Sequence, residues 1–166
     1  MAKKAVSICS MISTDQELLK SLRIPGLACL EIGAEFCGFA KAMEQTTRRL
    51  SQQAGERPVK FFRMVAETSE LFRPLWARSS PTFIFVKNGV FVQLLTGLDP
   101  TTFVPAFENA LPASLEECPA EKSLPEFDFE PIAAVLSKFT AIQTPAEYED
   151  DDAPKEEVQE EAKKEE

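Results

Sequence analysis

The sequence predicts an α/β domain with a mixed sheet, followed by a C-terminal extension. Short apolar runs of strand length alternate with segments of helical periodicity as far as Pro112. Strands that alternate with helices favour parallel pairing, and Lys87-Asn88-Gly89, which lies between two apolar runs, predicts an antiparallel hairpin at one edge. We therefore expect residues 1–112 to form a central mixed β-sheet that is flanked by helices.

Each element of the first half has its own signal. Serines interrupt the apolar run of the first expected strand, over residues 5–12. Thr14 and Glu17 have the spacing of a capping box, which begins a helix, and Pro25-Gly26 ends that helix with a turn. The next strand, over residues 27–32, is apolar on both faces, so we expect it to be central and buried.

A long helix is expected next, over residues 37–53, because apolar residues recur there at spacings of three and four. It is followed by a strand over residues 59–66 and by a short helix over residues 69–77. Two strands, over residues 82–86 and 90–95, then form the predicted hairpin.

The last helix of the domain is expected to begin at Thr101 or Thr102, which places Pro105 in its first turn.

Residues 113–145 are expected to form a linker and a short amphipathic helix, with Pro131 as its first residue. This segment has two interpretations: it folds back onto the domain, or it docks into a groove of a partner protein. The apolar residues available for either contact are Phe127, Phe129, Ile132, Leu136 and Phe139. Residues 146–166 hold eleven acidic and three basic residues, and we expect a disordered tail that solubilises the protein or binds a basic surface.

The composition argues against several classes of function. The chain contains no histidine, which excludes Ser-His and Cys-His triads, and its four cysteines do not have the spacing of zinc ligands. We therefore expect no metal and no cofactor. The net charge of −9 lies mainly in the acidic tail, so no basic stripe is available for nucleic acid. Since long apolar runs and a good signal peptide are missing, we expect a cytoplasmic protein that does not bind a membrane.

Residues 35–41 contain the main candidate site. Cys37 follows a buried strand and is expected to begin a helix, where the positive end of the helix dipole favours the thiolate form. The second thiol of a Cys-x-x-Cys pair is missing, because Ala40 stands in its place. Cys37 is therefore either an inert residue or a single reactive thiol that forms mixed disulfides.

Over residues 5–112 the chain resembles the thioredoxin family. Phe36-Cys37-Gly38-Phe39-Ala40-Lys41 stands where the family has Trp-Cys-Gly-Pro-Cys-Lys, and Ser80-Pro81-Thr82 matches the cis-proline segment that faces the active cysteines. The hairpin turn and Gly97 also match. Glu31 occupies the position of the family's buried carboxylate, six residues before the first active cysteine.

The resemblance implies a thioredoxin fold with a candidate redox thiol at Cys37. It also places Glu31 and Pro81 beside that thiol, with a cis peptide bond before Pro81. Thioredoxin chemistry needs a second thiol to resolve the mixed disulfide, and Ala40 removes it. No catalytic residue is therefore assigned, and Glu31 is expected to be a partly buried carboxylate that pairs with Lys60.

Two functions compete. The first is a non-catalytic thioredoxin-like accessory subunit that binds protein partners in a large assembly, and the second is a monothiol redox or redox-sensing protein that uses Cys37. Within the family, the chain resembles the thioredoxin-like light chains of axonemal outer-arm dynein. That resemblance implies dynein heavy or intermediate chains as partners, and the axoneme of a cilium or flagellum as the location. The partner surface of the domain is expected to include Phe36, Phe39, Ser80 and Pro81.

Overall fold

The computed structural model describes residues 8–139, which form a five-stranded mixed sheet with helices on both faces. The strands are β1 (Cys9–Ile12), β2 (Leu27–Gly33), β3 (Val59–Val65), β4 (Thr82–Lys87) and β5 (Val90–Thr96). They lie in the order β1-β3-β2-β4-β5, so that the wholly buried β2 is central, as its composition predicted. The expected α/β class is confirmed.

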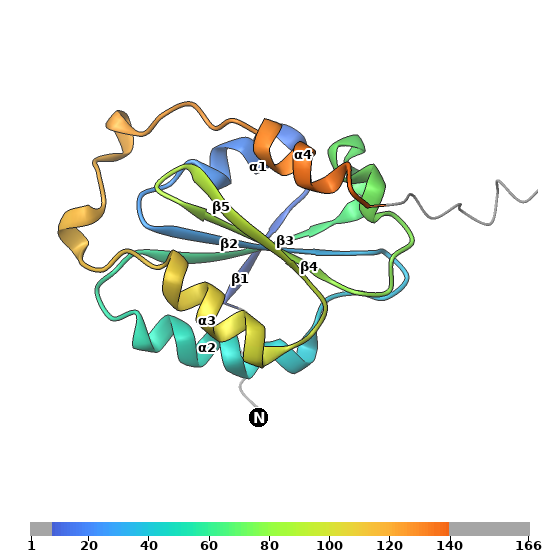
Figure 1. Ribbon diagram of the computed structural model, residues 1–166, viewed down its shortest axis with the longest axis horizontal. Coiled ribbons are helices and arrows are strands. Elements are labelled where there is room, and N and C mark those ends of the chain that lie inside the picture. The colour runs from blue at the N-terminus through green and yellow to red at the C-terminus, as the bar shows by residue number, and fades with distance from the viewer. Residues whose placement is uncertain (1–7, 140–166) are drawn as a thin grey trace, which may run out of the picture.

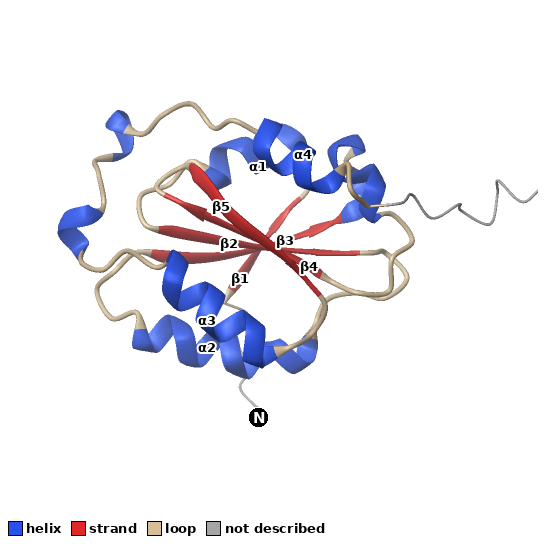
Figure 2. Ribbon diagram, viewed as in Figure 1, coloured by secondary structure: helices blue, strands red, loops and turns tan. Residues whose placement is uncertain are grey.

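Two layers of helices cover the sheet (Figure 1, Figure 2). One face carries α2 (Glu44–Gln53) and α3 (Pro100–Ala110), and the other carries α1 (Asp15–Leu22), the 3-10 segment η3 (Glu70–Leu75) and α4 (Glu130–Leu136). Each layer has its own apolar core, which includes Phe72 in one layer and Phe107 in the other. Shorter helical turns connect these elements: η1 (Lys41–Met43), η2 (Ala66–Thr68), η4 (Leu115–Glu117) and η5 (Glu121–Ser123).

Local signals in the sequence match local hydrogen bonds. The backbone N–H of Glu17 donates to Thr14 Oγ1 at 3.2 Å, and a Glu17 carboxylate oxygen accepts from the N–H of Ser13 at 2.9 Å. The predicted capping box is therefore confirmed, with its return contact at Ser13. Asn88 and Gly89 have φ values of 51° and 77°, which are the positive angles that a tight hairpin turn requires.

The direction of β4 differs from the prediction. β1 and β2 both pair with β3 in parallel, but β4 pairs with β2 antiparallel. Val65 and Thr82, which end β3 and begin β4, both lie at the Gly33 end of β2, so the chain does not recross the sheet between them. The short 3-10 turns of residues 66–75 replace the crossover helix that parallel pairing would need.

The prediction that Pro105 lies in the first turn of its helix is wrong. Asp99 caps α3, since its carboxylate accepts from the N–H of Thr101 at 2.8 Å, and Pro100 is the first helical residue. Pro105 therefore lies inside α3. It is solvent-exposed, so water can bind the carbonyl that lacks a helical donor.

The C-terminal extension folds back onto the domain, which was one of its two interpretations. Ile132 and Leu136 of α4 are 0% and 1% exposed and join the core of the α1 layer. Arg23 holds the preceding linker, because its guanidinium donates to the carbonyls of Leu124 at 2.7 Å and Pro125 at 2.9 Å. The acidic tail predicted at residues 146–166 lies outside the described residues.

Candidate functional site

Cys37 lies in a tight turn and not at the start of a helix. The carbonyl of Ala34 accepts from the N–H groups of both Cys37 and Gly38, at 3.2 and 3.1 Å, and Gly38 has a φ of +67°. The first helical residue is Lys41, in η1, so the predicted start at Cys37 is wrong. The left-handed conformation at Gly38 breaks the helical path, and the expected dipole contact with the thiol is therefore absent from the turn.

Gly33 permits this turn. A Cβ atom added at Gly33 would lie 2.7 Å from the carbonyl oxygen of Gly38 and 3.4 Å from the ring of Phe39. The backbone of the turn therefore folds directly over the end of β2, which brings Phe39 against the sheet. Phe36 and Cys37 remain on the outside, and Phe36 is 67% exposed.

Glu31 lies beneath the turn and is 5% exposed. One carboxylate oxygen accepts from the N–H of Ala40 at 2.5 Å, and the other accepts from Arg63 Nε at 2.9 Å. The prediction that Glu31 pairs with Lys60 is wrong. Glu31 is in register with Arg63 on β3, whereas Lys60 is in register with Ala28, whose side chain projects from the opposite face of the sheet.

Arg63 extends the charge pair toward the surface. Its Nη1 donates to Glu44 at 3.2 Å, and its guanidinium lies over the Phe39 ring, 5.2 Å from the centroid. Burial opposes the charged form of Arg63, but the hydrogen bond and negative charge of Glu31 outweigh it, so the pKa of Arg63 is raised. Arg63 therefore stays charged and neutralises Glu31, and Phe39 helps to shield the pair from water.

Ala40 stands where the second thiol of a Cys-x-x-Cys pair would lie. Its side chain is buried, at 7% exposed, and its backbone N–H is bound to Glu31. A carboxylate in this position could exchange a proton with a thiol at residue 40, but a methyl group has no proton to exchange. The site therefore keeps the buried carboxylate and lacks the resolving thiol.

The loop before β4 lies at the same end of the sheet as the Cys37 turn, because Thr82 pairs with Ile32. Pro81 is buried, Ser80 is exposed, and the carbonyl of Pro81 accepts from the N–H of Gly97 at 2.8 Å. The described residues contain no cis peptide bond, so the predicted cis bond before Pro81 is wrong. The intrinsically favoured trans form is compatible with the hydrogen bond that ties this loop to Gly97.

The other three cysteines are less accessible than Cys37. Cys29 is buried within β2, and burial raises its pKa well above the usual range. Burial also raises the pKa of the half-buried Cys9, although Arg63 opposes that effect. Cys118 lies in the linker beside Lys87, which is at the opposite end of β4 from Pro81. It is therefore not placed to resolve a disulfide at Cys37.

The candidate partner residues of the domain divide by exposure. Phe36 and Ser80 are exposed, Phe39 is half-buried against Arg63, and Pro81 is buried. Sequence reasoning missed Leu98, which is 49% exposed and directly follows Gly97. The match of Gly97 to a family position was the one signal that pointed to this loop.

The C-terminal candidates make contacts within their own chain. Ile132 and Leu136 are buried, and Phe127, Phe129 and Phe139 pack half-buried against the same core. The ring of Phe129 meets Phe72 edge to face, with centroids 5.7 Å apart. In this structure the apolar face of α4 is therefore occupied by the domain and does not form an open surface.

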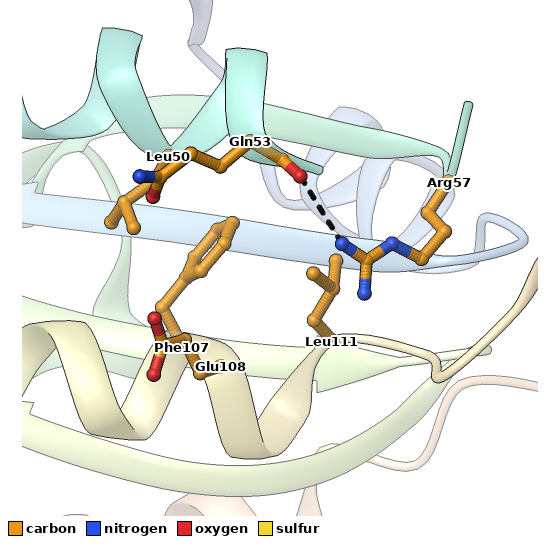
Figure 3. Close-up of a pocket in the computed structure, with 6 residues that line it drawn as sticks. All are labelled: Leu50, Gln53, Arg57, Phe107, Glu108 and Leu111. Atoms are coloured by element: carbon orange, nitrogen blue, oxygen red, sulfur yellow. Dashed lines mark hydrogen bonds between the residues drawn. The ribbon is translucent and has the colours of Figure 1, made fainter. Parts of the chain in front are cut away.

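A pocket of about 330 Å³ lies between the C-terminal halves of α2 and α3 (Figure 3). Leu50, Phe107 and Leu111 supply apolar lining, and Gln53, Arg57 and Glu108 supply polar lining. Arg57 donates to the carbonyls of Gln53, Ala54 and Pro112, at 3.2, 2.9 and 3.3 Å, so it ties the end of α2 to the end of α3. Sequence reasoning did not predict this pocket, because its walls come from residues far apart in the chain.

Two further features are absent from the part of the chain that the structure describes. Residues 8–139 contain no group of three or more His, Cys, Asp or Glu side chains arranged to hold a metal ion. Within the same range, no helix has both the length and the apolar character needed to cross a membrane.

No protein-family model matches the chain. A thioredoxin of Aspergillus fumigatus is 35% identical to it over 89 residues, which cover 53% of this chain and 77% of that protein. The 14 kDa dynein light chain of the flagellar outer arm of Chlamydomonas reinhardtii is 30% identical over 78 residues, which cover 46% of this chain and 60% of that relative.

Solved structures of thioredoxins have the same fold. The thioredoxin of Malassezia sympodialis has a TM-score of 0.51 at 22% identity, and the match covers 66% of this chain and 98% of that one. Mitochondrial thioredoxin 3 of Saccharomyces cerevisiae, in its oxidised form, also has a TM-score of 0.51, at 19% identity, with 61% and 94% covered. At these identities the structures support the fold alone.

Proposed function

This chain belongs to the thioredoxin family, and we propose that it acts as a non-catalytic accessory subunit that binds protein partners within a large assembly. The observation that carries the proposal is Ala40. A thioredoxin releases its substrate when a second thiol attacks the mixed disulfide, and a buried methyl group cannot make that attack. The surrounding frame, by contrast, is intact: Glu31 is fully paired and the Cys37 turn is held by hydrogen bonds.

The partner surface that we propose is the end of the sheet around the Cys37 turn. Phe36 is 67% exposed, and aromatic side chains are enriched in protein interfaces, while Leu98, at 49% exposed, adds apolar area to this surface. The turn and the loop before β4 share this end because Ile32 pairs with Thr82. A rigid frame favours binding, because less conformational freedom is lost when a partner docks.

We further propose that the assembly is an axonemal dynein or another microtubule-associated complex of cilia and flagella. In that case the partners would be dynein heavy or intermediate chains, and the protein would reside in the cytoplasm and the axoneme. The similarity to the flagellar outer-arm light chain of Chlamydomonas reinhardtii supports this assignment.

Sedimentation of the native protein tests the accessory function. Solubilised axonemes or cell extracts are separated on a sucrose gradient, and the protein is followed with an antibody. We expect it to travel with a complex much larger than its own 18.5 kDa and with dynein heavy chains. The variant Phe36→Ala should shift it toward the free fraction, whereas Val90→Ala, at an exposed residue of β5, should not. Recovery of the wild-type protein as a free monomer alone would contradict the proposal.

A second candidate function is a monothiol redox or redox-sensing role of Cys37. The exposure of Cys37 favours it, and so do the relatives that are thioredoxins. Insulin reduction in the presence of dithiothreitol tests the enzymatic form of this second function. We expect the wild-type protein and Cys37→Ser to be equally inactive, and turnover at thioredoxin-like rates that is lost in Cys37→Ser would establish the enzyme function instead.

A further inference from the structure

We propose that Glu67 is a positioning residue that locks together the two loops of the partner surface. This inference rests on the proposed function, because it concerns the same end of the domain. Glu67 lies in η2, directly beyond the C-terminal end of β3. One carboxylate oxygen accepts from the backbone N–H of Glu35 at 2.9 Å, and the other accepts from the N–H of Ala77 at 3.2 Å.

These two hydrogen bonds join segments that are distant in the chain. Glu35 begins the turn that presents Phe36 and Cys37, and Ala77 lies four residues before Pro81. Hydrogen bonds between a charged carboxylate and backbone N–H groups are stronger than those between neutral groups. Glu67 therefore restrains both loops through their backbones and leaves the exposed side chains free to meet a partner.

The Cys37 turn is held by a carboxylate at each end. Glu67 binds the N–H of Glu35 at its beginning, and Glu31 binds the N–H of Ala40 at its end. Between these points, Ala34 accepts from Cys37 and Gly38. The turn has no helical ladder of its own, so these side chains replace the restraint that a helix would provide.

The second loop also depends on Glu67. Ala77 has a φ of +56°, an uncommon value for a residue with a side chain, and its N–H is bound by the Glu67 carboxylate. We call the two hydrogen bonds of Glu67, to Glu35 and Ala77, the clamp. The backbone beside Glu67 is fixed by Trp76, whose Nε1 donates to the carbonyl of Ala66 at 2.8 Å. The backbone of Glu67 is therefore restrained, and its carboxylate restrains the Cys37 turn through the hydrogen bond from Glu35.

Residue-resolved hydrogen exchange of the full chain tests the clamp. In Glu67→Ala, we expect the amides of Glu35 and Ala77 to exchange at least about fivefold faster, because each loses its acceptor. The amide of Ala40 is the internal reference, since it is bound by Glu31. Glu70→Ala is the matched control, because Glu70 is an exposed glutamate that pairs with exposed Arg73 at 3.5 Å. It should leave all three amides unchanged.

A second variant covers the case in which Glu67→Ala does not fold. Glu67→Gln keeps one acceptor oxygen, so one of the two amides should lose protection and the other should retain it. Unchanged exchange at both Glu35 and Ala77 in a folded variant would overturn the clamp, as would an equal rise at Ala40. Sedimentation of Glu67→Gln then tests the link to function, with an expected loss of about tenfold in the complex-bound fraction. If the wild-type protein sediments alone while the exchange pattern holds, the proposed function fails and the clamp stands.

Discussion

Glu31 and Arg63 form a buried ion pair, and its contribution to the stability of the fold depends on both residues. The desolvation of each charge is offset by the contact at 2.9 Å and by the hydrogen bond from Ala40. Removal of one partner leaves the other buried without a countercharge. The sequence could place Glu31 near Cys37, because that spacing is local, but its partner depends on the register of two strands, and the prediction of Lys60 was therefore wrong.

Arg63→Met should destabilise the protein by about 3–5 kcal/mol, because it leaves Glu31 buried and unpaired. Urea unfolding, followed by the fluorescence of Trp76, measures this loss. The double variant Glu31→Gln/Arg63→Met should recover most of it, since no charge remains buried. Lys60→Met is the control and should change the free energy of unfolding by less than about 0.5 kcal/mol, because Lys60 is exposed. An equal loss in Lys60→Met would contradict the assigned pair.

The elements show which parts of the fold are encoded locally. The first-helix cap at Thr14 and the turn at Asn88-Gly89 depend on neighbouring residues, and both were predicted correctly. The direction of β4 and the break before Lys41 depend on contacts between distant segments. Gly38 illustrates the difference, because its identity allowed a positive φ, but the tight packing of its backbone on Gly33 required the assembled sheet.

The cap of α3 makes a pH-dependent contribution to stability. Hydrogen bonds from the side chain and N–H of Thr101 lower the pKa of Asp99 in the folded protein. Because the pKa of Asp99 is lower in the folded protein than in the unfolded chain, where it is about 3.9, the ionised carboxylate stabilises the fold at pH values above about 3.9. This contribution is lost as the pH falls through the pKa of the folded protein. Asp99→Ala should therefore lower the melting temperature at pH 7, and its difference from the wild-type protein should shrink below about pH 3.9.

Asn109→Ala is the control for this helix, because Asn109 is exposed in the last turn of α3 and does not titrate. Its effect on the melting temperature should be small and independent of pH. A deficit in Asp99→Ala that stays constant from pH 7 to pH 3 would show that the capping carboxylate is not the titrating group.

The C-terminal helix α4 is an integral part of the core. Leu136 is 1% exposed and packs in the α1 layer, so Leu136→Ala should lower the free energy of unfolding by about 2–5 kcal/mol. Lys138→Ala, at an exposed residue two positions later, should have little effect. Urea unfolding measures both variants. Equal stabilities would mean that α4 leaves the domain in solution, which would restore the alternative of docking into a partner.

At the scale of the whole molecule, the two ends of the sheet have different roles. The linker is tied to the hairpin end, where Lys87 pairs with Glu117 at 3.3 Å and Asn88 donates to the carbonyl of Glu117 at 3.1 Å. The opposite end carries the Cys37 turn and the Pro81 loop. The extension therefore completes the core without covering Phe36, which remains 67% exposed.

This arrangement predicts that the four thiols react very differently. A thiol reacts as its thiolate, and burial raises the pKa values of Cys9, Cys29 and Cys118, whereas Cys37 is exposed. Titration of the native protein with an aromatic disulfide reagent at pH 7.5 should therefore show one fast thiol, with the other three at least about tenfold slower.

Cys37→Ser should abolish the fast phase, and unfolding in urea should expose the remaining three thiols together. A second fast thiol that persists in Cys37→Ser would contradict the arrangement. Cys118→Ser would then show whether the linker opens at the hairpin end, because Cys118 is half-buried there and is held in place by the contacts of Glu117. Loss of the second fast phase in that variant would locate the opening in the linker, and its persistence would locate it at the sheet, at Cys9 in β1 or Cys29 in β2.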